Sequence, residues 1–152
     1  MKYWLIKSEG DCYPITALKA DKVTPWSGIR NYQARNYMRD EMSVGDLCLF
    51  YHSNADPSGV YGVAKVASKP YPDLTAFDPK DEHYDPKSNK ESPTWILVDM
   101  KYVSTFKNPV LLEDLKRTKA LDGMLVTKKG MRLSVQPVSE KHFKKVVEMG
   151  VQ

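Results

Sequence analysis

The chain has 152 residues, 41% of them hydrophobic and 28% charged, which is ordinary for one globular domain with a sizeable core. A formal net charge of +4 is compatible with a nucleic-acid partner but does not establish one. Two cysteines exclude a disulfide framework, and no Cys-x-x-Cys motif or histidine-rich cluster predicts a metal. No apolar run approaches the length of a membrane span, and no signal peptide precedes the first apolar run. We therefore expect a single cytoplasmic domain over residues 1–152, monomeric, without metal, cofactor or membrane contact.

The first elements of the chain lead to a central motif at 26–39. An aromatic and β-branched run predicts a strand over 3–7, and Pro14 in a first turn predicts a short helix over 14–20. Residues 21–25 are expected to form a linker that ends in a proline.

The central motif reads Trp-Ser-Gly-Ile-Arg-Asn-Tyr-Gln-Ala-Arg-Asn-Tyr-Met-Arg and predicts a helix from about Asn31 to Met42. Trp26, Ser27 and Gly28 stand just before this helix. A stacking ring, amides and guanidinium groups are what a planar, hydrogen-bonding ligand next to a phosphate requires. The alternative is an ordinary amphipathic helix with a core tryptophan at its start, and helical periodicity alone favours that alternative.

The middle of the chain predicts two strands and a long ordered loop. A nearly unbroken apolar run at 47–53 indicates a strand buried on both faces; a loop at 54–59 and a strand at 60–69 follow. Gly62 and Ala64 share one face of the second strand, so another strand or a ligand approaches closely there. The prolines of segment 70–93 exclude regular structure, but its aromatic residues exclude a disordered linker, so we expect an ordered and functional loop.

The last part of the chain completes an α+β domain. We expect a long strand over 94–106, short helices over 111–117 and 121–126, and a strand over 130–137 stopped by proline. Ser139 is a suitable cap for a final helix. Five or six strands interrupted by short helices predict a small mixed β-barrel flanked by helices.

Three function classes are compatible with these elements. The first is an enzyme acting on a nucleotide or base, with His52 and Asp73 as acid–base residues; no nucleophile elbow or glycine-rich phosphate loop accompanies them. The second is a protein-interaction module that uses segment 70–93. The third is a binding domain whose strand ends converge on one mouth of the barrel, where a flat base stacks between aromatic rings.

The binding hypothesis names two sets of residues. Trp26 is expected at the mouth, partly accessible beside Ser8 and Asn31, with segment 70–93 as one wall. The candidates for contacting the base are Lys7, Ser8, Trp26, Ser27, Asn31, Tyr32, His52, Ser53, Tyr71, Asp73, Arg132 and Ser134. The candidates for contacting phosphate are Arg30, Arg35 and Arg39.

Motifs along almost the whole chain resemble the EVE domain family, part of the PUA-like superfamily and related to YTH domains. The matching stretches are 3–9, 26–36, 45–46, 50–53, 61–64, 71–73, 84–88, 98–99 and 132–137, together with Trp95. Small departures are Gly10, Ser27 and Ile29, where the family commonly has Pro, Asp and Val.

The resemblance implies a PUA-like β-barrel flanked by helices, and non-catalytic recognition of a modified base. In eukaryotic relatives this base is a modified cytosine in DNA, and YTH relatives read methylated adenine in RNA; both nucleic acids stay open for this chain. By the same resemblance Lys7, Ser8, Trp26, Ser27 and Asn31 occupy the pocket positions.

Overall fold

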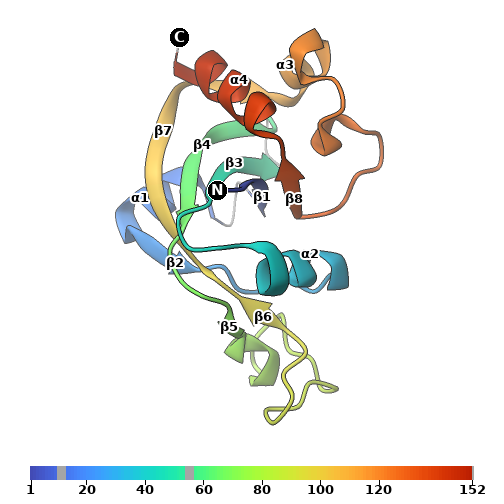
Figure 1. Cartoon of the computed structure of the whole chain (residues 1–152). Coiled ribbons are helices and arrows are strands. Elements are labelled where there is room, and N and C mark those ends of the chain that lie inside the picture. Colours follow the sequence, from blue (N-terminus) through green and yellow to red (C-terminus); the bar gives the residue numbers. More distant parts are fainter. Residues whose placement is uncertain (10–12, 54–56, 152) are drawn as a thin grey trace.

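A six-stranded sheet of order β2-β7-β4-β3-β1-β8 forms the body of the protein (Figure 1). The structure, a computed structural model, describes residues 1–9, 13–53 and 57–151. The strands of this sheet are β1 (Tyr3–Glu9), β2 (Val23–Pro25), β3 (Leu47–Ser53), β4 (Gly59–Val66), β7 (Asp99–Leu111) and β8 (Val135–Val138). β5 (Tyr71–Pro72) and β6 (Ile96–Leu97) form a separate small sheet.

Four α-helices flank the curled sheet: α1 (Ile15–Asp21), α2 (Tyr32–Asn36), α3 (Leu112–Arg117) and α4 (Glu140–Val151). In Figure 1, α4 lies near one end of the sheet, and segment 70–93 forms a lobe at the other end. This half-barrel with flanking helices confirms the α+β class predicted from the sequence. No helix in the described part of the chain is long and apolar enough to cross a membrane.

Strand β1 is buried on both faces because its side chains alternate between two hydrophobic clusters. Trp4 belongs to the cluster that contains Leu18 of α1 and Met38. Leu5 belongs to the cluster that contains Phe143 and Val146 of α4. The inner residues of β3 are likewise all buried, as predicted for 47–53.

Two expectations for the N-terminal half need correction. The supposed linker contains β2, whose Thr24 pairs with Met100 of β7; Pro25 is tolerated because β2 is an edge strand. The predicted helix over 31–42 is α2 followed by a π-helical turn (Tyr37–Glu41), in which Met42 N–H donates to the Tyr37 carbonyl at 2.9 Å.

The close approach predicted at Gly62 is a strand contact. A Cβ atom there would lie 2.2 Å from the Ser104 carbonyl oxygen of β7, so backbone rather than ligand occupies that space. The strand itself ends at Val66 instead of residue 69. Of the loop predicted over 54–59, residues 54–56 lie outside the described residues and Gly59 already belongs to β4.

Several boundaries in the C-terminal half also differ. The strand predicted over 94–106 is interrupted at Val98, and its second part, β7, continues to Leu111. The helix predicted over 121–126 is replaced by 3₁₀ turns at Lys119–Leu121 and Leu125–Thr127. The last strand begins only at Val135 and runs through Pro137, because β8 is an edge strand that tolerates a missing donor. The Ser139 cap is confirmed: its Oγ accepts a hydrogen bond from His142 N–H at 3.2 Å.

Candidate functional site

Five of the predicted binding residues meet where β1 and β3 end. These strands are parallel, so their carboxyl ends share one edge of the sheet, and Ser8 is paired in register with His52. β8 runs antiparallel on the other side of β1, where Lys7 N–H donates to the Ser134 carbonyl at 2.9 Å. We call this group the strand-end site; its members are Lys7, Ser8, His52, Ser53 and Ser134.

The polar groups of the strand-end site are tied to backbone carbonyls. The Lys7 ammonium donates to the Met131 carbonyl at 3.0 Å, and burial lowers the pKa of Lys7. Ser8 Oγ donates to the Tyr13 carbonyl, and Ser53 Oγ donates to the Ser8 carbonyl at 3.3 Å. These bonds hold two hydroxyls and one ammonium at a common edge.

His52 has a structural position in this site. Its Nε2 accepts a hydrogen bond from Ile15 N–H at 3.0 Å, which requires that nitrogen to be unprotonated. Its ring stacks on Tyr61 with centroids 4.0 Å apart and planes 9° from parallel. Burial lowers the pKa of His52, so the neutral imidazole is favoured.

A series of aromatic rings lies next to Ser8 and His52, on the face of the sheet that these two residues share. Trp26 contacts Tyr13 and Phe50 edge-on, with centroids 6.1 and 5.6 Å away, and Phe50 contacts His52 in the same way at 5.4 Å. Only 8% of the Trp26 surface is exposed. The prediction of a partly accessible Trp26 ring is therefore wrong, because Tyr13 and Phe50 cover it.

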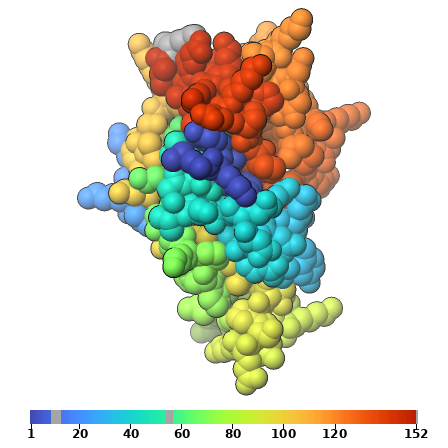
Figure 2. All heavy atoms as spheres, viewed as in Figure 1, coloured from blue at the N-terminus to red at the C-terminus, as the bar shows by residue number. Residues whose placement is uncertain are grey.

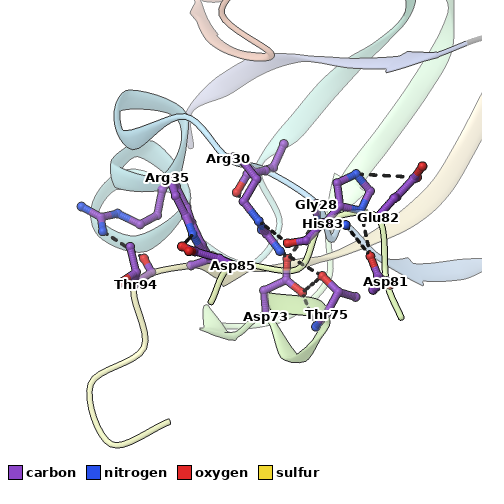
Figure 3. Close-up of polar contacts among 12 residues, drawn as sticks. Gly28, Arg30, Arg35, Asp73, Thr75, Asp81, Glu82, His83, Asp85 and Thr94 are labelled. Atoms are coloured by element: carbon purple, nitrogen blue, oxygen red, sulfur yellow. Dashed lines mark hydrogen bonds and ion pairs between the residues drawn. The ribbon is translucent and has the colours of Figure 1, made fainter. Parts of the chain in front are cut away.

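A second group of predicted residues fastens segment 70–93 to the central motif (Figure 3). The Arg30 guanidinium donates to the His83 carbonyl at 2.9 Å and to Asp73 Oδ2 and Thr75 Oγ1, each at 3.1 Å. Gly28 N–H also donates to Asp73, at 2.8 Å. We call this group the loop clamp: Gly28, Arg30, Asp73, Thr75 and His83. Segment 70–93 is thus folded onto the body, as predicted, although it contains β5 and a 3₁₀ turn.

The loop clamp uses Arg30 and Asp73 for structure. Asp73 has no exposed surface, and it accepts two further hydrogen bonds, from the amide and the hydroxyl of Thr75. Burial works to raise the pKa of Asp73, but hydrogen bonds from Thr75, Gly28 and Arg30 outweigh it and lower the pKa below 3.8. The Arg30 guanidinium and the Asp73 carboxylate are thus hydrogen-bonded to each other and to Thr75, Gly28 and His83.

A stack of rings and guanidinium groups borders the loop clamp. Tyr32, which is 61% exposed, lies 5.0 Å from Trp95 between ring centroids. The Arg35 guanidinium lies over Tyr32 at 5.0 Å, and that of Arg30 lies over Trp95 at 5.4 Å. Trp95 also donates to Asp85 at 2.7 Å. The sequence prediction of the site did not include Trp95. The family motif contains this residue, so the motif could have identified it.

The remaining predicted residues lie outside these interactions or have local partners. Asn31 caps α2 by accepting from Ala34 N–H at 2.9 Å. Arg39 pairs with its neighbour Asp40 at 2.8 Å. Tyr71 donates to Asp99 at 2.5 Å; burial and this carboxylate raise its pKa to about 12. The Ser27 and Arg132 side chains are exposed.

Neither the sequence nor these contacts define a metal centre. No group of three or more histidine, cysteine or carboxylate side chains within residues 1–9, 13–53 and 57–151 is arranged to hold a metal ion. Cys48 is fully buried, and burial raises the pKa of its thiol.

The curled half-barrel, with polar strand ends above buried aromatic rings, defines an α+β domain of the class expected from the sequence motifs. Residues 2–149 match the EVE domain, and the chain belongs to the EVE domain family.

Known proteins resemble the chain over nearly its whole length. It is 38% identical to thymocyte nuclear protein 1 of Gallus gallus, in an alignment covering 97% of this chain and 68% of that protein. The crystal structure of human THYN1 in complex with DNA containing 5-methylcytosine is 34% identical, with a TM-score of 0.93; the match covers 100% of this chain and 99% of that one. A YTH domain of Zygosaccharomyces rouxii, solved with N6-methyladenosine RNA, is 12% identical with a TM-score of 0.58, covering 99% and 87% of the two chains, and shares the fold.

Proposed function

We propose that the protein is a non-catalytic domain that binds nucleic acid and recognises a modified base at the strand-end site. The observation that carries this proposal is the likeness to human THYN1, which was crystallised with DNA containing 5-methylcytosine and matches the whole of this chain. Modified cytosine in DNA is therefore the first ligand to test, and a modified RNA base is the second.

The strand-end site supplies groups suited to reading a base edge. The Ser8 and Ser53 hydroxyls each donate to a backbone carbonyl, so toward a base edge their oxygens can only accept. The Lys7 ammonium carries three donors, one of which bonds the Met131 carbonyl at the same edge of the sheet. Trp26 and Phe50 lie on the face of the sheet that carries Ser8 and His52, and they supply surfaces on which a base can stack there. The Lys7 ammonium lies over the Tyr51 ring at 5.8 Å, on the opposite face. Because Tyr13 covers Trp26 edge-on and is itself only partly buried, a base reaches Trp26 by displacing Tyr13.

The contacts of His52 and Asp73 favour binding over acid–base catalysis. The two residues belong to different groups, His52 to the strand-end site and Asp73 to the loop clamp. The Asp73 carboxylate is sealed by Thr75, Gly28 and Arg30, and His52 already uses Nε2 as an acceptor. A general acid or base must reach the proton it transfers, and neither the Asp73 carboxylate nor His52 Nε2 can do so without breaking these hydrogen bonds.

The test compares oligonucleotides that contain cytosine or 5-methylcytosine, titrated against the wild-type protein and against Trp26→Phe. Both bases stack, so the difference between them is one buried methyl group, which contributes about 0.8 kcal/mol; the wild type should therefore bind the methylated strand about fourfold more tightly. Trp26→Phe retains an apolar ring in the core and should keep the fold while reducing that ratio.

Arg39→Ala is the matched control, because Arg39 is exposed and bonds only to Asp40 among the described residues. It should discriminate as the wild type does. Equal affinity of the wild type for plain and modified strands, in DNA and in RNA, would contradict the proposal.

Two expectations from the sequence stay predictions. One is the cytoplasmic location. The other is a protein partner for segment 70–93, which would be supported by a partner that is pulled down even after nuclease treatment.

A further inference from the structure

A short turn beside the strand-end site carries positive charge that forms no ion pair with the described side chains. This turn comprises Lys128, Lys129, Gly130, Met131 and Arg132, and we call it the cationic turn. We propose that its two lysines and Arg132 hold the phosphate backbone of the strand whose base enters the strand-end site. This inference rests on the proposed function and replaces Arg30, Arg35 and Arg39 as the phosphate contacts.

Hydrogen bonds fix the cationic turn next to the site. Met131 N–H donates to the Lys128 carbonyl at 3.2 Å, and Gly130 takes a left-handed conformation with φ of 75° that closes the turn. The Lys7 ammonium then bonds the Met131 carbonyl at 3.0 Å, and Lys7 N–H bonds the Ser134 carbonyl at 2.9 Å. Because Lys7 is itself part of the strand-end site, the turn has a defined position at its rim.

The charge on this turn is exposed, and no ion pair neutralises it among the side chains that the structure describes. Lys128, Lys129 and Arg132 are exposed, and their side chains form no ion pair or hydrogen bond within the described part of the chain. No Asp or Glu occurs in the sequence between Asp122 and Glu140. The cations thus remain available to a polyanion, while Lys7 adds a partly buried amine on the side of the base.

The arginines first predicted for this role are already engaged. Arg30 is held by the loop clamp, and Arg39 bonds Asp40. Arg35 donates to the Thr94 carbonyl at 2.9 Å and to Asn36 at 2.8 Å. A guanidinium has five N–H donors, so these bonds do not use all of them, but carboxylates already offset the charge of Arg30 and Arg39. The side chains of the cationic turn have no such carboxylate partner within the described part of the chain.

The position of the turn suits a strand that runs along the surface. In Figure 2 the orange segment that leads from α3 toward β8 projects on one side of the molecule, open to solvent. Phosphate contacts position a nucleic acid without reading its sequence, and base contacts then discriminate. The cationic turn accordingly supplies affinity for the phosphate backbone, and the neighbouring strand-end site supplies specificity for the base.

The experiment measures the salt dependence of binding for Lys128→Gln/Lys129→Gln, with plain and 5-methylcytosine oligonucleotides. Each lost phosphate contact should reduce the log–log salt slope by about 0.7 for single strands or about 0.9 for duplex. Two lost contacts should reduce it by about 1.4–1.8 and weaken both oligonucleotides by the same factor. The ratio between modified and plain strands, and the melting temperature, should not change.

Lys101→Gln/Lys107→Gln is the matched control, because these exposed lysines lie on β7, separated from β8 in the sheet by β4, β3 and β1. The control should keep the wild-type slope. An unchanged slope in the Lys128/Lys129 variant, or an equal loss in the control, overturns the inference. A reduced slope in a protein that never discriminates between the strands supports the inference and refutes base reading. A wild type that binds no nucleic acid refutes both.

Discussion

Removing the Arg30 side chain should release segment 70–93 from the body of the protein. Arg30→Ala deletes the hydrogen bonds to His83, Asp73 and Thr75 and the contact with the Trp95 ring. The Asp73 carboxylate stays buried and loses its positive partner.

The expected cost follows from what Asp73 retains. Removing one partner of a buried ion pair typically costs about 3–5 kcal/mol. The Arg30 side chain is 21% exposed, and Asp73 keeps the donors of Thr75 and Gly28, so we expect the lower limit of about 3 kcal/mol. For a chain of this length such a loss lowers the melting temperature by about 6–12 °C.

Urea unfolding and limited proteolysis measure the global and the local effect separately. The variant should be cleaved within residues 78–92 at urea concentrations where the wild type resists, because the clamp holds that stretch on the body. Arg39→Ala serves as the control and should leave the unfolding midpoint and the cleavage pattern unchanged. In Arg30→Ala/Asp73→Asn the buried charge is gone, so part of the lost stability should return.

If Arg30→Ala loses less than about 1 kcal/mol of unfolding free energy, which is the range of an exposed ion pair, then Arg30 does not stabilise Asp73 as a buried pair. If the double variant loses as much unfolding free energy as the two single variants together, Arg30 and Asp73 are not coupled.

Four further predictions concern the buried core and the two titrating residues His52 and Asp73. Trp26→Ala should cost about 3–5 kcal/mol in urea unfolding because the ring is buried; a loss near zero would restore the exposed-ring hypothesis. Gly62→Ala should lower the melting temperature by several degrees through a cost of about 1–3 kcal/mol, since its Cβ meets the Ser104 carbonyl. The native-state pKa of His52 is lowered, so the unfolded chain binds its proton first and stability should decline as pH falls below 6.5. The lowered pKa of Asp73 adds a second decline below about pH 3.8, which Asp73→Asn should flatten in unfolding curves measured across pH.

The sequence predicted those elements that are determined by adjacent residues. The apolar run of β3 and the cap at Ser139 depend on adjacent residues, and both were predicted. β2 was missed because three residues ending in proline carry no strand pattern, and its pairing with β7 is decided by residues far away in the chain. The π-helical turn was missed because its side-chain spacing resembles that of an α-helix.

In the candidate site, too, features set by adjacent residues were predicted and features set by distant contacts were not. The barrel prediction brought the strand ends with Ser8 and His52 to one mouth, but it did not include the parallel pairing of β1 and β3 that places them side by side. The burial of Trp26 agrees with the alternative that helical periodicity favoured, a core tryptophan, but periodicity does not reveal that Tyr13 and Phe50 are the rings that cover it. The hydrogen bonds of Arg30 could not be predicted, because Asp73 lies 43 residues further along the chain and no local sequence pattern identifies it as the partner.

The position of β1 between β3 and β8 has a consequence for how the chain folds as it is synthesised. Trp4 pairs with Cys48 on one side but with Pro137 on the other, so one edge of this buried strand waits for almost the whole chain to emerge. Such long-range pairing slows folding and leaves strand edges open to other chains. A nascent chain stalled before Val135 should therefore expose the backbone edge of β1 together with the apolar face that α4 covers, and should depend on chaperones until β8 is complete.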